Sequence, residues 1–324
     1  STMAAVERDV VSTSAGAVAA TIVVGAVLLP ADANTTQDAI GRALQAIDMA
    51  RVGPKERLYC YDPTAPREAE RKSNFAIADE VIRALNDRRI MIALQPVVNA
   101  GDHDLEFYEC LVRLRLPDGV VLDASEFVPV AEELGLSKLI DHRALELVIE
   151  LLRATTNRKL ALNVSALSTT EGYWIDALEA LTGKDRGLTE RLIVEITESA
   201  AISDMEATAA FVSALKSAGC KVVLDNLSAG SASFRSIRSL SVDMVKIDGS
   251  FIENLGQDKR SETLVKTQIE LAHGFGLATV GEWVSDTRSV ELLEKAGVSY
   301  LQGDLFGAPE LYQDRSADAE KSAS

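Results

Sequence analysis

Acidic and amide side chains, together with one lysine, close one apolar run after another between residues 105 and 302. The residues are Glu109, Asn163, Glu195 with Glu198, Asp225 with Asn226, Lys246 with Asp248, Glu282 and Gln302. A single acid after a strand is most simply a helix cap or a surface charge. Capping alone does not account for a whole series at the same point of successive strands. The pattern therefore indicates a shared site.

These side chains are of the types that bind hard metal ions and phosphates. Carboxylate and amide oxygens suit Mg²⁺, Mn²⁺ or Ca²⁺ better than zinc. Several carboxylates packed together without a cation would raise one another's pKa and destabilise the fold. A divalent metal would remove that conflict, and Lys246 and Arg113 would add positive charge for a phosphate.

Short β-branched runs alternate with amphipathic stretches from residue 89 onward. Strands are predicted at residues 90–97, 105–114, 160–164, 192–196, 221–224, 244–247, 278–280 and 299–301. Helices are predicted at residues 138–153, 206–218, 262–274 and 288–296. This pattern predicts an α/β fold, a TIM-like (β/α)8 barrel whose first two strands form a hairpin at Gly101 and Asp102. Strand ends of a barrel converge on one rim, which would gather the polar residues. A doubly wound sheet is the alternative, but no G-x-G-x-x-G motif follows the first strand.

The chain is acidic. Its 49 Asp and Glu against 33 Lys and Arg give a formal net charge of −16 over 324 residues. That field repels a phosphate backbone, and no polybasic run interrupts it, so we expect neither a nucleic-acid polymer nor an anionic membrane as partner. A phosphorylated ligand must therefore be held by local cations or metal ions.

Cysteine and histidine usage excludes several classes of site. The three cysteines, Cys60, Cys110 and Cys220, are far apart in the sequence and form no CxxC or Cys/His cluster. They indicate neither a disulfide framework nor a zinc site, and fit a reducing cytoplasm. Only three histidines occur and they share no ligand spacing, which disfavours a histidine-based hydrolase.

The first 62 residues predict a small unit of strand, helix and strand. The apolar stretch at residues 16–30 is too short to span a bilayer and lacks the basic flank of a signal peptide, so it predicts one or two buried strands. A membrane or signal segment is the alternative. A helix is predicted at residues 35–51 and an edge strand at 57–61. The turn and charged run that follow predict a linker.

A series of short motifs between residues 95 and 303 points to a known family. The motifs are Gln95-Pro96, Glu109-Cys110-Leu111 with Arg113, Asn163-Val-Ser165, Glu195-Ile-Thr-Glu-Ser199, Lys246-Ile-Asp248, Gly281-Glu282-Trp283-Val284 and Gln302-Gly303. In order and spacing they resemble an EAL domain, the family of bacterial cyclic di-GMP phosphodiesterases and their inactive, cyclic di-GMP-binding relatives. The family's fold is a barrel with an antiparallel strand near its start.

The resemblance implies a two-metal centre. The ligands of the first metal would be Glu109, Asn163, Glu195 and Asp225. Asp248 would lie close to the second metal and Lys246 near the attacking water, while Glu282 would bind the second metal or act as the base. Mg²⁺ or Mn²⁺ would support hydrolysis, with Ca²⁺ as a non-productive substitute. Water would attack one phosphodiester bond and open cyclic di-GMP to linear pGpG.

The resemblance also implies a ligand site. Contacts with the dinucleotide would come from Gln95, Leu111, Arg113, Asn163, Asp248 and Gln302. Among these, Arg113 would pair with a phosphate. Glu198 would brace the loop after the fifth strand.

The sequence departs from the family pattern mainly near residue 226. The family's Asp-Asp-Phe-Gly reads Asp225-Asn226-Leu227-Ser228 here, so Asn226 offers a neutral oxygen where a bridging anion is expected. One charge at contact distance is worth ~4 kcal/mol at intermediate dielectric. Residues 229–233 lack the family's aromatic residue, and Ser285 replaces the second glutamate of the Ala-Glu-Gly-Val-Glu motif. These departures predict an intact first metal site and a damaged second one.

The N-terminal part resembles the end of a GGDEF domain without its signature loop, so we expect a fragment of such a domain and no diguanylate cyclase activity. The predicted organisation is a GGDEF-like C-terminal fragment at 1–64, a linker helix at 65–88, the EAL domain at 89–312 and a disordered tail at 313–324.

Three functions remain open. The first is a degenerate cyclic di-GMP receptor with weak or no hydrolysis, the second an active metal-dependent phosphodiesterase, and the third a non-binding scaffold. The resemblance further implies a homodimer, and a receptor would act through a protein output partner.

Overall fold

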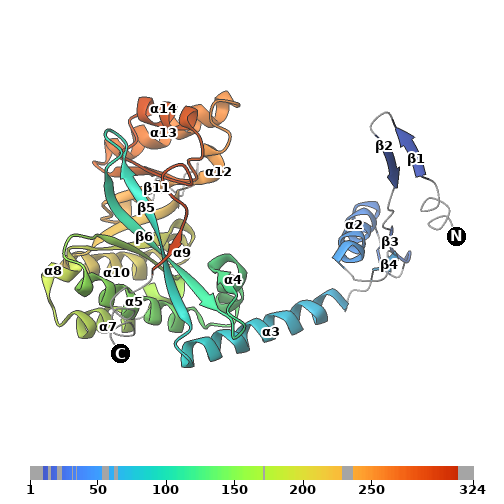
Figure 1. The fold of residues 1–324 in the computed structure, drawn as a ribbon, viewed down its shortest axis with the longest axis horizontal. Helices are drawn as coiled ribbons and strands as arrows, with labels where there is room; N and C mark the ends of the chain where they lie inside the picture. Colours follow the sequence, from blue (N-terminus) through green and yellow to red (C-terminus); the bar gives the residue numbers. More distant parts are fainter. Residues whose placement is uncertain are drawn as a thin grey trace. The chain divides into compact units, whose positions relative to one another are not determined.

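The computed structural model describes residues 10–13, 16–19, 24–30, 32–33, 35–52, 58–61, 65–170, 172–227 and 236–312. The chain divides into two compact units, Ser1–Ala76 and Ile77–Ser324. The division falls within helix α3 (Ala65–Asn86) (Figure 1). Across these described ranges, every helix is too short or too polar to cross a bilayer. The predicted tail at residues 313–324 and the altered loop at 229–233 lie outside them.

The N-terminal unit contains the predicted strand, helix and strand. Its elements are β1 (Val10–Thr13), β2 (Gly16–Ala19), β3 (Val24–Ala26), α2 (Thr36–Val52) and β4 (Leu58–Cys60). Strand β1 pairs antiparallel with β2, and β3 pairs parallel with β4. Gly25 allows α2 to pack closely on β3, because a Cβ there would lie 2.5 Å from the Ala43 carbonyl oxygen. Strand β3 is half-buried rather than buried as predicted, since it belongs to a sheet of only two strands.

The second unit is a closed barrel. Its strands are β5 (Ile90–Asn99), β6 (Leu105–Arg115), β8 (Leu160–Val164), β9 (Leu192–Thr197), β10 (Lys221–Leu227), β11 (Met244–Ile247), β12 (Ala278–Gly281) and β13 (Tyr300–Gln302). Around the barrel the order is β5, β13, β12, β11, β10, β9, β8, β6 and back to β5. Strand β5 is antiparallel to both neighbours, and the other pairings in the ring are parallel. The predicted barrel with an antiparallel strand near its start is confirmed.

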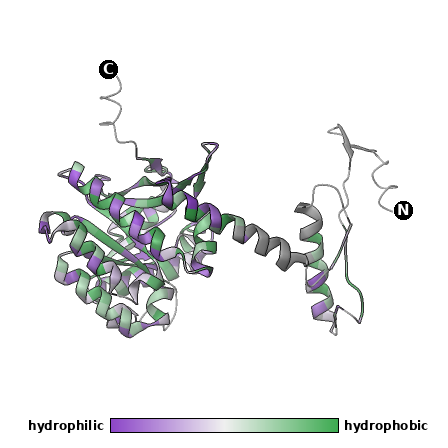
Figure 2. Cartoon of the chain, turned by 90° about the horizontal axis from the view of Figure 1, so that it is seen from below, coloured by the Kyte–Doolittle hydropathy of each residue, from purple (hydrophilic) through white to green (hydrophobic). Residues whose placement is uncertain are grey.

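Helices and two short strands surround this ring. They are β7 (Val121–Asp123), α4 (Ala124–Glu133), α5 (Ser137–Ala154), α6 (Ala166–Thr169), α7 (Tyr173–Thr182), α8 (Arg186–Thr189), α9 (Glu198–Ser203), α10 (Met205–Ala218), α12 (Gly249–Ile252), α13 (Lys259–Gly274), α14 (Thr287–Ala296) and β14 (Glu310–Leu311). Figure 2 shows hydrophobic colour along the strands and hydrophilic colour on the outer helix faces. The largest buried cluster fills the space between strands and helices.

A smaller apolar layer fills the barrel interior. Its buried members, one from each of seven strands, are Val97, Phe107, Ala161, Ile193, Val223, Met244 and Val280, with Tyr300 packed against them. Because side chains alternate between the two faces of a strand, the residues two positions further along also face inward. This layer therefore forms the floor on which the next interior layer stands.

Candidate functional site

The next interior layer is polar in all eight strands. Two residues beyond the apolar layer, toward the carboxyl ends of the parallel strands, stand Glu109, Asn163, Glu195, Asp225, Lys246, Glu282 and Gln302, with Gln95 on the reversed strand β5. Strand pairing aligns them, since Gln95 lies opposite Glu109 and Asn163 opposite Glu195. The predicted convergence of strand-end residues thus has a simple cause. In each strand, the polar residue stands two positions from the residue that belongs to the apolar layer.

Lys246 occupies the centre of this layer. Its Nζ lies 2.8 Å from Glu109 Oε2, 3.0 Å from Glu195 Oε2 and 2.8 Å from Glu282 Oε1. The lysine is 1% exposed and Glu195 is fully buried. A buried ammonium loses its hydration, so it persists only when it is paired and hydrogen-bonded. Two carboxylates from β6 and β9, and that of Glu282 directly after β12, meet that requirement.

Two amides fix the orientation of Glu109. Asn163 Nδ2 donates to Glu109 Oε1 at 2.7 Å, and Gln302 Nε2 donates to Glu109 Oε2 at 2.6 Å. Gln302 Nε2 also donates to Gln95 Oε1 at 3.1 Å, and Gln95 Nε2 donates to the Gly307 carbonyl at 3.3 Å. A hydrogen-bonded chain of side chains therefore runs from the loop after β13 to the first acid of the site.

The central ion pairs shift the pKa values of both partners. Burial disfavours the charged form of Glu109, but Lys246 and the donated amide hydrogens outweigh it, so its pKa is lowered. Burial opposes the charge of Lys246 as well, yet the surrounding acids, Glu109 foremost, raise its pKa well above the ordinary value. Both groups are therefore held in their charged forms.

The remaining acids exceed what one lysine can neutralise. Burial, followed by the charge of Glu109, raises the pKa of Glu195 well above the ordinary value. Burial also raises the pKa of Asp225, and raises the pKa of Glu282 to about 7. Burial is the largest cause of each shift; the charges of neighbouring acids add to it, and Lys246 opposes it.

The donor set fits a divalent cation in charge and chemistry. As they stand in the described part of the chain, no three His, Cys, Asp or Glu side chains are grouped to hold a metal ion; the carboxylates surround Lys246 instead. Glu195 Oε1 and Gln302 Oε1 are nevertheless buried without a hydrogen-bond partner among the described residues. Hard oxygen donors with unmet bonding capacity and surplus negative charge are what Mg²⁺ or Mn²⁺ requires.

Asn226 donates hydrogen bonds to the acid that precedes it, Asp225. Its backbone N–H donates to Asp225 Oδ1 at 2.7 Å, and its Nδ2 donates to Asp225 Oδ2 at 3.1 Å. Both oxygens of Asp225 thus receive hydrogen bonds from one residue. Asn226 has a φ of 56°, a left-handed conformation that asparagine tolerates better than most residues. An aspartate here could not donate the second bond.

Other predicted site residues lie outside the central layer. Leu111 lines an adjoining cavity. Arg113 Nε pairs with Asp123 Oδ1 at 2.7 Å, across the β6–β7 ladder. Asp248 accepts the Ser250 N–H at 2.8 Å and caps α12, and Glu198 is buried in the first turn of α9. The structure therefore gathers the metal ligands expected on strands more closely than those expected on loops.

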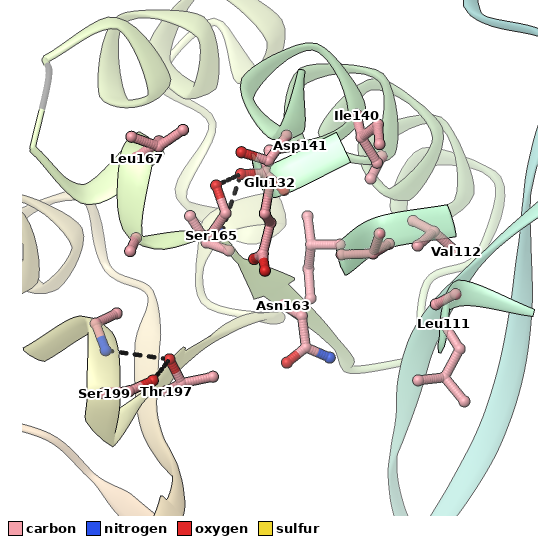
Figure 3. Close-up of a pocket in the computed structure, with 18 of the residues that line it drawn as sticks. Leu111, Val112, Glu132, Ile140, Asp141, Asn163, Ser165, Leu167, Thr197 and Ser199 are labelled. Atoms are coloured by element: carbon pink, nitrogen blue, oxygen red, sulfur yellow. Dashed lines mark hydrogen bonds between the residues drawn. The ribbon is translucent and has the colours of Figure 1, made fainter. Parts of the chain in front are cut away.

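The cavity of about 550 Å³ opens beside strands β6, β8 and β9. In Figure 3, Glu132, Asp141 and Ser165 gather on one side of it and Leu111 and Val112 on the other. Its size is within the range of ~300–1,000 Å³ typical of ligand pockets, and its lining is largely apolar.

Sequence reasoning missed Asp141, which shapes this cavity. Its Oδ2 accepts hydrogen bonds from the Ser165 N–H at 3.0 Å, the Ser165 hydroxyl at 2.6 Å and the Ser168 hydroxyl at 2.7 Å. It thereby fixes the turn that follows Asn163. The available signal was an acid on the apolar face of a helix, between Ile140 and Ala144, where a charge needs a buried partner.

The fold and the site define a (β/α)-barrel protein with a buried centre of acids, amides and one lysine at the carboxyl rim. Residues 78–309 match the family model of the EAL domain. This match covers more than half of the chain, which therefore belongs to the EAL domain family. The family membership indicated by the motifs is confirmed.

Curated relatives share this region at moderate identity. The cyclic di-GMP phosphodiesterase PdeF of Escherichia coli is 27% identical over 248 residues, which cover 75% of this chain and 33% of the relative. The bifunctional diguanylate cyclase/cyclic di-GMP phosphodiesterase MucR of Pseudomonas aeruginosa is 26% identical over 295 residues, covering 88% of this chain and 42% of the relative. The chain thus spans less than half the length of either protein.

Solved structures share the fold. The FimX EAL domain of Pseudomonas aeruginosa, bound to c-di-GMP, aligns with a TM-score of 0.68 at 26% identity, over 72% of this chain and 96% of that chain. A c-di-GMP complex of the PaMucR phosphodiesterase aligns with a TM-score of 0.66 at 26% identity, over 72% and 97%.

Replacing Lys246 tests the central ion pairs. We expect Lys246→Met to lower the free energy of unfolding by about 3–5 kcal/mol at pH 8, because three buried carboxylates lose their counter-charge. At pH 5 the loss should be smaller, since the acids of the variant then accept protons in the folded state. Urea denaturation in EDTA, followed by tryptophan fluorescence, measures both values. Lys266→Met, which breaks an exposed pair with Glu270, should cost no more than about 0.5 kcal/mol. Equal losses at the two pH values would contradict the assignment.

Replacing Glu282 tests the surplus charge. Its folded-state pKa of about 7 lies above the ordinary 4.5, so its protonated form stabilises the fold fully below pH 4.5 and that stability is lost as the pH rises toward 7. Glu282→Gln stays neutral. In EDTA it should reduce the fall in stability between pH 5 and pH 8 by on the order of 1–3 kcal/mol. Glu270→Gln, an exposed acid, should leave that fall unchanged. If the stability of the Glu282 variant falls between pH 5 and pH 8 as much as that of the wild type, this interpretation is wrong.

Proposed function

We propose that this chain binds cyclic di-GMP in bacterial second-messenger signalling, as a receptor with weak or no hydrolysis. Weak or no hydrolysis is supported by one observation: both oxygens of Asp225 accept hydrogen bonds from Asn226. An acid that is already satisfied by a neighbouring amide is a poorer metal ligand than a free carboxylate. The missing charge at residue 226 acts in the same direction.

The cavity and the polar layer support binding of the dinucleotide. A relative in the family is named as a cyclic di-GMP phosphodiesterase, and two similar solved structures contain bound c-di-GMP. The cavity adjoins Leu111 and Asn163, so a base entering it would bring the attached phosphate to the central layer. Arg113 would pair with a phosphate after releasing Asp123, and Gln302 would contact the ligand.

The central residues would hold divalent metal, Mg²⁺ or Mn²⁺. Glu109, Asn163, Glu195 and Asp225 would hold a first ion, and Asp248 would lie at a second. When bound, such ions lower the pKa of water and balance phosphate charge. Glu282, with a pKa of about 7, is suited to accept a proton from water at its carboxylate near neutral pH. Lys246 would orient the three carboxylates around it.

The active phosphodiesterase remains the second candidate function because the acids and the lysine expected on the strands lie together in the central layer. Glu109, Glu195 and Glu282 each pair with Lys246, which supports this candidate. Residual turnover, for instance with Mn²⁺, would be consistent with this geometry. The scaffold hypothesis is weaker, because a scaffold has no need of five buried or half-buried acids at one rim.

Three further features are part of the proposal. The parallel pair β3 and β4 with α2 between them is compatible with the end of a GGDEF domain, and the alignment with MucR extends into this unit. Cys60, Cys110 and Cys220 are free thiols, which agrees with a cytoplasmic setting. We also expect a homodimer, to be measured by sedimentation of the purified chain.

Calorimetry followed by chromatography separates the candidate functions. Titration of the chain with cyclic di-GMP in Mg²⁺ should release or absorb heat with a stoichiometry of one, and the same samples should contain little or no pGpG. Steady production of pGpG would establish the phosphodiesterase and remove the receptor proposal. Absence of binding heat, checked at two temperatures, would leave only the scaffold. Glu109→Gln serves as the control that should weaken binding of the metal and the ligand.

Restoring the missing acid tests the cause of weak hydrolysis. Asn226→Asp should raise the rate of pGpG formation in Mg²⁺ by roughly tenfold or more, equivalent to ~1.4 kcal/mol of transition-state stabilisation, because it returns one negative charge to the second metal site. Asn226→Gly is the matched control, since glycine suits the φ of 56° and removes the contact with Asp225 without adding charge. If the Asp and Gly variants turn over equally, the damage lies elsewhere.

A further inference from the structure

Trp283 stands in a conformation that tryptophan rarely adopts. Its φ is 55°, in the left-handed region, directly after the site residue Glu282. The residues on both sides of it are fixed. Glu282 is paired with Lys246, and the Val284 N–H donates to the Gln302 carbonyl at 2.9 Å. The chain therefore imposes the strained conformation at Trp283, at a position where the family motif has glycine.

The strain is not offset by burial of the indole. Trp283 is 56% exposed, among the most exposed large apolar side chains in the described part of the second unit. One side of the ring lies on Gly249, where an added Cβ would come within 2.2 Å of the indole Cγ and Cδ2. Gly249 follows Asp248 at the carboxyl end of β11. The backbone thus holds one face of the indole, and the exposed remainder points to solvent at the rim.

The position of Trp283 is opposite the cavity. Strand β12, which precedes Trp283, and strand β8, which leads to the cavity, are four places apart in a ring of eight strands. They therefore lie across the barrel from each other, with the Lys246 layer between them. A ligand with two bases and a central pair of phosphates would place its bases at these two sides of the rim.

We propose that Trp283 is a stacking platform for the second guanine of cyclic di-GMP, while the first guanine enters the cavity beside β8. This inference rests on the proposed function and adds to it a specific recognition residue. Every nucleobase has a π-face, and an aromatic ring whose one side is held by the protein offers the other side at little entropic cost. The alternative is a ring that only covers Gly249, which would contribute to stability and not to affinity.

Binding measurements on four variants distinguish these roles. Trp283→Gly, Trp283→Ala and Trp283→Leu should weaken binding of cyclic di-GMP by roughly 5- to 150-fold, the range expected for loss of one base stack. Trp283→Phe should retain most of the affinity, because phenylalanine also stacks. The glycine variant fits the φ of 55° without strain, so its loss of affinity cannot come from a strained backbone. Wild-type affinity in the Gly and Ala variants would overturn the proposal.

Tryptophan fluorescence supplies a second measurement, which a change in stability alone would not alter. The chain has two tryptophans, and Trp174 is 2% exposed in the apolar core. Cyclic di-GMP should quench the emission of Trp283 in the wild type and leave the remaining emission of the Phe variant unchanged. Phe275→Ala removes an aromatic side chain that is 41% exposed before the start of β12, at the opposite end of the barrel, and should bind like the wild type.

The two proposals fail in different ways. If the wild type gives no heat with cyclic di-GMP, the proposed function is wrong and the stacking role falls with it. If the wild type binds but the emission of Trp283 does not change, only the stacking role is wrong. Equal weakening by the Phe and Ala variants would also overturn it, because a packing defect rather than stacking would then explain the loss.

Discussion

The ammonium of Lys246 is the interaction on which the geometry of the site depends. It lies in the barrel interior, one layer above apolar side chains, and contacts carboxylates from two other strands and one directly after a third. A shift of one residue in the pairing of β11 would turn Lys246 outward toward the helices, and a shift of two would bring it level with the apolar floor. Either shift would leave buried charges unpaired, at a cost of several kcal/mol. The ion pairs thus specify strand register as well as position the acids.

Without further cations, the acids of this centre outnumber the one lysine that neutralises them. Lys246 carries one positive charge against several acids, and burial, with the charges of neighbouring acids after it, raises the pKa values of Glu195, Asp225 and Glu282. Asn226 relieves some of it by donating hydrogen bonds to Asp225, where an aspartate would add to it. An asparagine at position 226 therefore also keeps one negative charge away from Asp225 in the metal-free fold. A receptor can use this arrangement, because binding requires a formed pocket more than it requires tightly held ions.

Much of the barrel could be predicted from sequence, since its strands are short β-branched runs and each ends in the same polar position. The two-residue step from apolar floor to polar site is visible in Phe107 and Glu109, or in Met244 and Lys246. Contacts set by tertiary structure could not be predicted. The pairing of Arg113 with Asp123 depends on the ladder with β7, a strand of three residues with no sequence pattern of its own. The buried role of Asp141 depends on which hydroxyls meet it.

Two left-handed residues directly follow acids of the polar layer. Asn226 follows Asp225 and Trp283 follows Glu282, with φ values of 56° and 55°. After Asp225 the pairing of β10 with β11 shifts register, and after Glu282 the chain continues beyond the end of β12 toward α14. Asparagine adopts this conformation readily, and its side-chain amide donates a hydrogen bond to Asp225. Tryptophan does not, and its ring gains little from burial. A bulky residue held in such a conformation needs a compensating interaction at its exposed face, and the proposed stacking on a nucleobase would supply it.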